Sequence, residues 1–225
     1  MIKNISNLGD AAIYCDFGAE VNKKINFEVI RYFKAIKEKD IKGIVNLTPS
    51  YNKLIVSYDL RVTNFKEIKD KIENLEINAI QKKATKKLEI PVCCDAPYSL
   101  DIERLEKKLN LSREKILENF FNKEYFCYMT GFIAGMPFLG DLDENMRAQR
   151  LETPRVKVPK GSIGLTEQFA NIYTFESPGG WNIIGNTPLD VFDSSKENHP
   201  NLISPGDLVT FKKITLENFK NHNEQ

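Results

Sequence analysis

The chain has 225 residues with 32 basic and 31 acidic side chains, giving a net charge of +1. This length supports one large domain or two smaller ones with a buried core, and the near neutrality argues against a nucleic-acid partner. No apolar run reaches the roughly 18 residues of a membrane span, and Met1–Asn4 precedes no signal-peptide block. We therefore expect a cytoplasmic protein without a membrane partner.

Alternating and helical apolar patterns follow one another in the first 90 residues. In chain order they predict a strand, a helix, two strands, a helix and a strand, at residues 11–18, 22–39, 41–48, 54–58, 64–75 and 88–92. Asn64 with Glu67 three residues later is typical of a helix N-terminus. The order β-α-β-β-α-β is that of a ferredoxin-like α+β domain, which we place at residues 1–90 as a scaffold or docking domain.

A second domain is expected at residues 91–225. It begins with two short helices that open near Ser99 and Ser112, each placed as an N-cap. Short apolar segments separated by Gly and Pro turns then predict a sandwich or small barrel, with strands at 125–129, 156–158, 163–165, 172–175, 181–184, 189–192 and 208–211. The polar tail after Thr215 is expected to fray.

Cysteines and histidines are too scattered to suggest a metal site. The four cysteines contain no C-x-x-C unit, and the two histidines, His199 and His222, lie far from them in sequence. Cys93 and Cys94 are adjacent on an expected strand, so their side chains should point to opposite faces. We expect the thiols to fill the core and expect no metal in this chain.

The stretch from Gly131 to Asp193 holds most of the glycines, half of the prolines and the only tryptophan. Such density predicts a surface of rigid loops, either a binding face or the turns of a barrel without a site. Lys160-Gly161-Ser162 has the ingredients of a P-loop in the wrong order, and residues 1–198 contain no histidine to activate a nucleophile. Arginines and backbone donors remain as the candidate polar groups.

Arg150 and Arg155 flank Pro154 and could hold a carboxylate or phosphate bidentately. The alternative for either arginine is a surface ion pair with Glu152 or Asp143. The segment Ser177-Pro178-Gly179-Gly180-Trp181 could aim backbone N–H groups at an anion, or could be a hairpin turn followed by a core tryptophan.

Five ordered motifs identify a resemblance to a known family. They are GFIAGMPFLG at 131–140, PRVKVPKGS at 154–162, SPGGW at 177–181, IGNTPLDVFD at 184–193 and PGD at 205–207. Together they resemble the family of the 5-oxoprolinase B subunit, also called allophanate hydrolase subunit 1 or the KipI family. The resemblance covers nearly the whole chain and implies a ferredoxin-like domain followed by a cyclophilin-like β-barrel domain.

The resemblance also implies partners and a reaction. The B subunit of this family works with a C subunit of the allophanate hydrolase subunit 2 type and an A subunit of the LamB/YcsF type. Together they open 5-oxoproline to L-glutamate with ATP, which the complex uses with Mg²⁺, and the B and C subunits activate the lactam. Two alternatives stay open: a KipI-like inhibitor of a sensor histidine kinase, and a module of an allophanate or urea-type amide hydrolase or carboxyltransferase.

The sequence departs from the family at several positions. Ala134-Gly135-Met136-Pro137-Phe138 stands where relatives read PGFPY, and the histidine that relatives carry near Phe120 is absent. Phe169-Ala170-Asn171 replaces a Q-T-G, so that the neighbouring Gln168 would have to supply the glutamine's hydrogen bonds. These departures bear on the substrate rather than on the family.

We expect a cleft shared with the C subunit. Arg150 or Arg155 would hold a carboxylate or phosphate, and the Gly179-Gly180 backbone would stabilise negative charge. The expected substrate-binding residues are Arg150, Arg155, Ser177, Gly179, Gly180 and Trp181. The expected loop at the cleft or partner is Gly131, Phe132, Gly135, Met136, Pro137 and Phe138, which in the regulator alternative is an apolar docking surface.

Overall fold

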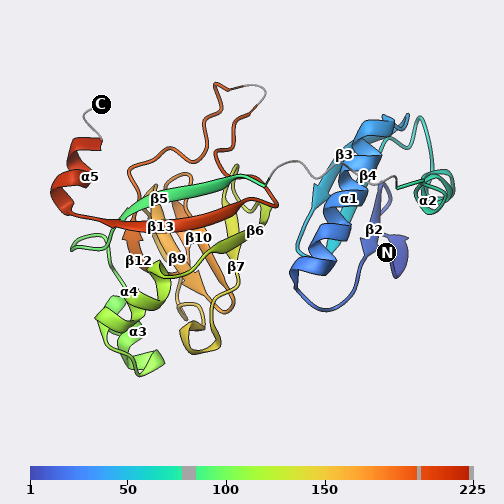
Figure 1. Ribbon diagram of the computed structural model, residues 1–225. Coiled ribbons are helices and arrows are strands. Elements are labelled where there is room, and N and C mark those ends of the chain that lie inside the picture. The colour runs from blue at the N-terminus through green and yellow to red at the C-terminus, as the bar shows by residue number, and fades with distance from the viewer. Residues whose placement is uncertain (78–84, 197–198, 223–225) are drawn as a thin grey trace. The chain divides into compact units, whose positions relative to one another are not determined.

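Figure 1 shows the computed structural model of the protein, which describes residues 1–77, 85–196 and 199–222. The described residues form five α-helices and a closed barrel of seven strands, so the expected α+β class and the barrel are confirmed. The chain divides into two compact units, residues 1–84 and 85–225, whereas the sequence pattern placed the boundary after residue 90.

The first unit contains one four-stranded antiparallel sheet and two helices. The sheet has the order β1-β2-β4-β3. The elements are β1 (Asn4–Asn7), β2 (Ala12–Asp16), α1 (Lys23–Lys39), β3 (Ile44–Pro49), β4 (Lys53–Tyr58) and α2 (Phe65–Glu73).

Local signals fix both helices of this unit. The side chain of Asn22 accepts a hydrogen bond from the Ile25 N–H at 2.9 Å, and that of Asn64 accepts one from the Glu67 N–H at 3.1 Å. These caps satisfy N–H groups that a helix leaves free at its start. The apolar residues of the sheet and of the two helices meet in one core, made by Ile13, Cys15, Val29, Ile36, Leu54, Val56, Ile68 and Ile72.

The strand expected at 88–92 does not complete this sheet. It is β5 (Lys87–Cys93), which pairs in parallel with β13 (Leu208–Ile214) in the barrel. In the first unit, the edge next to β2 is occupied by β1, which precedes β2 in the chain. The alternation of Leu88, Ile90 and Val92 identified a strand correctly, but an alternating pattern carries no information about which sheet the strand joins.

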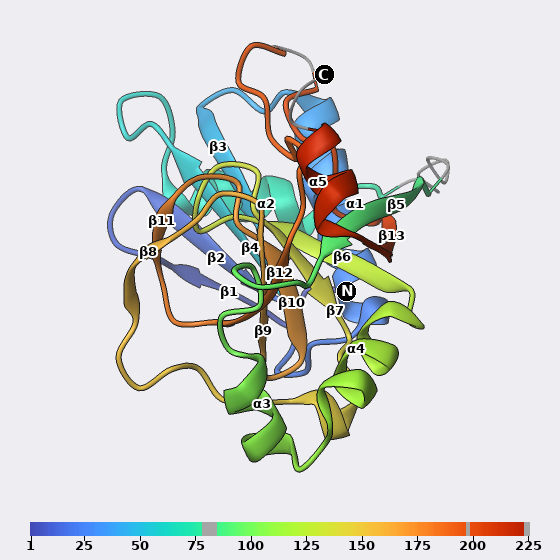
Figure 2. The same ribbon diagram turned by 90° about the vertical axis from the view of Figure 1, so that its left-hand side faces the viewer.

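The barrel of the second unit has the strand order β10-β7-β6-β13-β5-β12-β9, closed by the pairing of β9 with β10. Besides β5 and β13 it contains β6 (Tyr125–Thr130), β7 (Pro137–Gly140), β9 (Ser162–Thr166), β10 (Phe169–Ile172) and β12 (Asn182–Asn186). Outside the barrel, β8 (Arg155–Val158) and β11 (Ser177–Gly179) form a two-stranded ribbon (Figure 2).

Three helices and one 3₁₀ turn accompany the barrel. They are α3 (Ile102–Leu109), α4 (Arg113–Phe121), α5 (Leu216–His222) and η1 (Glu144–Met146). Figures 1 and 2 show α3 and α4 packed together beside the barrel. Ile90, Phe120, Tyr125 and Phe211 meet in the core between α4 and the barrel, where the Phe120 and Phe211 rings stack with centroids 4.6 Å apart.

Several expected boundaries in this unit are corrected. Ser112 caps α4 as expected, but α3 begins after Asp101 rather than near Ser99. The strand expected at 172–175 ends at Ile172, and the segment 189–192 contributes only an isolated bridge from Phe192 to Asn201.

The tail after Thr215 is not frayed over its described residues, because α5 buries Phe219 against Tyr98 with ring centroids 4.5 Å apart. This helix is polar except for Leu216 and Phe219, and the mean polarity of a segment does not reveal a contact of this kind. Within residues 1–77, 85–196 and 199–222, no helix combines the length and apolar character needed to cross a bilayer.

The four cysteines are buried and should react slowly with thiol reagents. Burial raises the pKa of Cys15 and Cys94 to about 12 and raises the pKa of Cys93 and Cys127 above the usual range of a thiol. Since the thiolate is the reactive species, we expect little reaction with a disulfide reagent at pH 8 until guanidinium chloride unfolds the chain. Rapid modification of any cysteine in the native protein would contradict this burial.

Candidate functional site

Arg150 and Trp181, both predicted to lie at the site, are in contact. The Arg150 guanidinium carbon lies 5.8 Å from the Trp181 ring centroid, within the range of a cation–π contact. Arg150 lies in the loop before β8 and is exposed, whereas Trp181 directly precedes β12 and is buried. The Trp181 ring also packs edge-to-face on Phe138 of β7, with centroids 5.5 Å apart. Arg150 from the loop before β8 and Phe138 from the motif at 131–140 therefore meet at the indole ring of the motif at 177–181.

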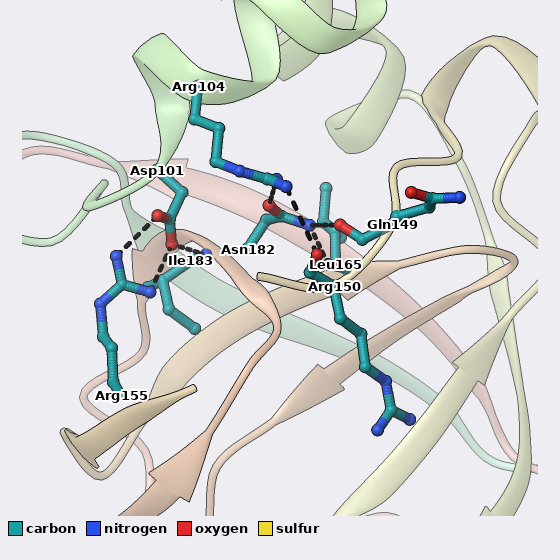
Figure 3. A network of polar contacts seen from close by, with 8 residues as sticks. All are labelled: Asp101, Arg104, Gln149, Arg150, Arg155, Leu165, Asn182 and Ile183. Atoms are coloured by element: carbon teal, nitrogen blue, oxygen red, sulfur yellow. Dashed lines mark hydrogen bonds and ion pairs between the residues drawn. The ribbon is translucent and has the colours of Figure 1, made fainter. Parts of the chain in front are cut away.

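Arg155, the second predicted arginine, is engaged by Asp101. Its two terminal nitrogens donate to the two carboxylate oxygens of Asp101 at 2.9 and 2.6 Å (Figure 3). The Asp101 side chain is only 5% exposed and also accepts the Ile183 N–H at 2.7 Å. The partners proposed from sequence, Glu152 and Asp143, are therefore not the ones that Arg155 uses.

The two arginines consequently differ in what they offer a ligand. The two terminal nitrogens of the Arg155 guanidinium are occupied by Asp101, and this bidentate pair neutralises its charge. Within the part of the chain that the structure describes, Arg150 has no carboxylate partner. Arg150 is thus the arginine with the charge and the exposure to bind an anion.

The Gly179-Gly180 backbone differs from the expected anion nest. Neither glycine has the positive φ angle that such a nest requires. Gly179 ends β11, paired with Arg155, and the Gly180 carbonyl accepts the Leu151 N–H at 2.7 Å. In the same ribbon, the hydroxyl oxygen of Ser177 is buried without a hydrogen-bond partner among the described residues.

Gly179 is needed for a steric reason. A Cβ atom at this position would lie 2.2 Å from the hydroxyl oxygen of Tyr173, a buried side chain whose pKa is raised by burial. At Gly180 the nearest atom to such a Cβ would be 3.6 Å away, on Pro154, which is an ordinary contact. Of these two glycines, only Gly179 lies so close to a neighbouring side chain that a Cβ atom would not fit.

We expect Gly179→Ala to lower the free energy of unfolding by about 1–3 kcal/mol, because the added methyl group displaces Tyr173 or the ribbon. The matched variant Gly180→Ala should change it by less than about 1 kcal/mol. Urea denaturation followed by Trp181 emission measures both. Equal losses in the two variants would contradict the steric difference.

The loop at 131–138 is mostly packed inward. Phe132 is 74% exposed, whereas Met136, Pro137 and Phe138 are buried, and the Asn171 side-chain nitrogen lies 3.8 Å from the Met136 sulfur. A Cβ on Gly135 would lie 2.3 Å from the Phe192 ring, so Gly135, with φ +72°, permits this packing. The expected apolar docking surface therefore reduces to Phe132, because its other apolar members fill the interior.

Gly131, the first residue of this loop, donates its N–H to the Met136 carbonyl at 3.0 Å and so closes the loop between β6 and β7. Gln168, considered as a substitute for the family glutamine, donates to Asp141 at 3.0 Å. The Tyr128 hydroxyl donates to the same carboxylate at 3.0 Å. The Gln168 amide is thus used to hold Asp141.

The sequence reasoning missed three residues that organise the site. Asp101 is the N-cap residue of α3, Arg104 lies in its first turn, and Asn182 is the first residue of β12 (Figure 3). Their partners lie 17 to 82 residues away in sequence, so no local pattern pointed to them. No group of three or more histidine, cysteine, aspartate or glutamate side chains is placed to hold a metal ion in the described ranges.

Comparison with known proteins places the chain in a family. The family model of the carboxyltransferase domain, subdomain C and D, matches residues 3–203. The chain is 33% identical over 233 residues to the 5-oxoprolinase B subunit of Bacillus subtilis (strain 168), covering 98% of this chain and 97% of that protein.

Solved structures share the fold of this chain. The structure of TTHA0988 has a TM-score of 0.80 at 28% identity, over 91% of this chain and 40% of that longer chain. Urea amidolyase of K. lactis has the same TM-score at 19% identity over 96% of this chain and 15% of its own, which shows a shared fold. This chain therefore belongs to the family of the 5-oxoprolinase B subunit, within the carboxyltransferase subdomain C and D proteins.

Proposed function

We propose that this chain is the B subunit of an ATP-dependent 5-oxoprolinase that converts 5-oxoproline to L-glutamate together with a C and an A subunit. Its barrel, of the cyclophilin-like type, would form with the C subunit the site that activates the lactam. The observation that carries this proposal is the exposed Arg150 guanidinium over Trp181, a cation without an ion-pair partner in the described residues. The similarity to proteins named as the B subunit of 5-oxoprolinase supports the substrate.

The chemistry of the site fits the carboxylate of 5-oxoproline. A planar guanidinium offers two parallel N–H donors to a carboxylate, and its contact with an indole face restricts its orientation. Arg155, held in the same region by Asp101, adds rigidity rather than a second free cation. Arg150 would therefore bind and orient the substrate, and the ring-opening groups would come from the assembled complex.

The P-loop-like segment at residues 160–162 has its polar groups engaged within the chain. In the segment that most resembles a P-loop, the Lys160 ammonium pairs with Asp190 at 2.6 Å. The Gly161 N–H donates to the Tyr173 carbonyl at 2.7 Å, so neither group is directed at a phosphate. We propose that the assembled complex uses ATP.

Reconstitution tests the proposal. The chain is coexpressed with its matching A and C subunits, and product formation is measured with 5-oxoproline, urea or allophanate, each with and without ATP. We expect ATP-dependent turnover of 5-oxoproline to glutamate that is lost when this chain is omitted. An intact complex that turns over urea or allophanate but not 5-oxoproline would overturn the substrate assignment.

A further inference from the structure

The residues on either side of Arg150 are tied to the residues on either side of Trp181. The Asn182 side-chain nitrogen donates to the Gln149 carbonyl at 3.1 Å, and the Leu151 N–H donates to the Gly180 carbonyl at 2.7 Å. Two backbone segments about 30 residues apart in sequence are thus joined just before and just after the cation–π pair. These hydrogen bonds fix the Arg150 backbone with respect to the Trp181 ring, independently of any contact of the Arg150 side chain.

Arg104 of α3 connects both segments. Its guanidinium donates to the side-chain oxygen of Asn182 and, at 3.4 Å, to the carbonyl oxygen of Arg150 (Figure 3). The Asn182 side-chain nitrogen also donates a hydrogen bond to the Leu165 carbonyl of β9 at 2.9 Å. Asn182 is fully buried, so its orientation is set by its three partners Arg104, Gln149 and Leu165.

Asp101 and Arg104 lie three residues apart, which places them on the same side of the helix start. Asp101 binds the backbone N–H of Ile183 and its own N–H donates to the Ile183 carbonyl at 2.9 Å, while Arg104 binds the preceding Asn182. One turn of α3 therefore holds the first two residues of β12, directly after Trp181.

We infer that Arg104 and Asn182 are positioning residues for anion binding by Arg150, an inference that rests on the proposed function. Arg104 donates its hydrogen bonds to protein groups and not to the ligand. It would act on anion binding by fixing the position of the Arg150 backbone. The arginine side chain has many rotamers, so a cation–π contact alone does not fix the position of the Arg150 backbone. That position is fixed by the hydrogen bonds that the neighbouring residues Gln149 and Leu151 make.

The only tryptophan gives a direct readout of this geometry. In the chain without substrate, Arg150→Ala should change the emission of Trp181, because a cation leaves the ring. Arg104→Gln should produce a similar change, and the double variant should show little beyond either single one, since both act on one contact. Arg104→Lys, which has one side-chain nitrogen in place of the two that donate in Arg104, should give an intermediate change.

In the reconstituted complex, Arg104→Gln should raise KM for 5-oxoproline about 10-fold with a smaller change in kcat, as expected when binding geometry is lost. The matched control is Arg113→Gln on α4, whose guanidinium also donates to a backbone carbonyl, that of Cys94 at 2.7 Å, outside this network. It should leave both the emission and KM unchanged.

The outcomes separate the two proposals. If Arg104→Gln is folded and leaves both the Trp181 emission and KM as in the wild type, the positioning role is wrong. If Arg104→Gln and Arg150→Ala change the emission alike but neither changes KM, then Arg104 positions Arg150 and the substrate role of Arg150 fails. A loss of stability in Arg104→Gln without a change in emission or KM would assign Arg104 to structure alone.

Discussion

Arg150→Ala is expected to lower kcat/KM for 5-oxoproline by about 10- to 100-fold in the assembled enzyme, which corresponds to the loss of a hydrogen bond between charged groups. The loss should appear mainly in KM, because the proposed role is to bind the substrate carboxylate. Arg150 is exposed and makes no ion pair in the described residues, so its removal should barely change stability.

The matched comparison is Arg150→Lys. Lysine keeps the positive charge but lacks the planar pair of donors, so we expect it to recover only part of the lost affinity. An analogue of 5-oxoproline without the carboxylate should be a poor substrate for the wild type and for Arg150→Ala to a similar degree. Wild-type kinetics in Arg150→Ala would remove this residue from the binding site.

Local signals in the sequence predicted local structure well. The caps at Asn64 and Ser112 are where the sequence placed them, because a cap depends on residues within one helical turn. The assignment of 88–92 to the first sheet failed because strand pairing joins residues far apart in the chain, as Lys87 does with Leu208. The last strand of the predicted β-α-β-β-α-β order therefore belongs to the barrel and not to the first unit.

In the candidate site, too, local motifs were predicted and contacts between distant residues were not. The motif at 177–181 and the loop around Arg150 were selected correctly as neighbours, and Trp181 does contact both Arg150 and Phe138. The role of Arg155 could not be predicted, since its partner Asp101 lies 54 residues away in sequence, whereas Glu152 and Asp143 are nearer along the chain. A buried carboxylate at a helix start is indistinguishable in sequence from an ordinary exposed one.

Asp101 should be the most costly of these residues to replace. Asp101→Ala leaves the Arg155 charge and the Ile183 N–H without their partner in a nearly buried position. Breaking a buried pair costs about 3–5 kcal/mol, but Arg155 remains 28% exposed and can be partly solvated. We therefore expect the free energy of unfolding to fall by about 2–4 kcal/mol, measured by urea denaturation with Trp181 emission, which reports on the barrel unit.

The pair can be tested as a unit. Arg155→Ala should also destabilise the barrel, and the double variant should be less destabilised than the sum of the single ones, because each single change already removes the shared contact. Asp101→Asn retains an acceptor for the Ile183 N–H and should lose less than Asp101→Ala. Strictly additive losses would show that the carboxylate stabilises β12 independently of Arg155. Coupled losses would mean that the carboxylate stabilises this region through its ion pair with Arg155. Arg150 would then be the cation that remains available to bind substrate.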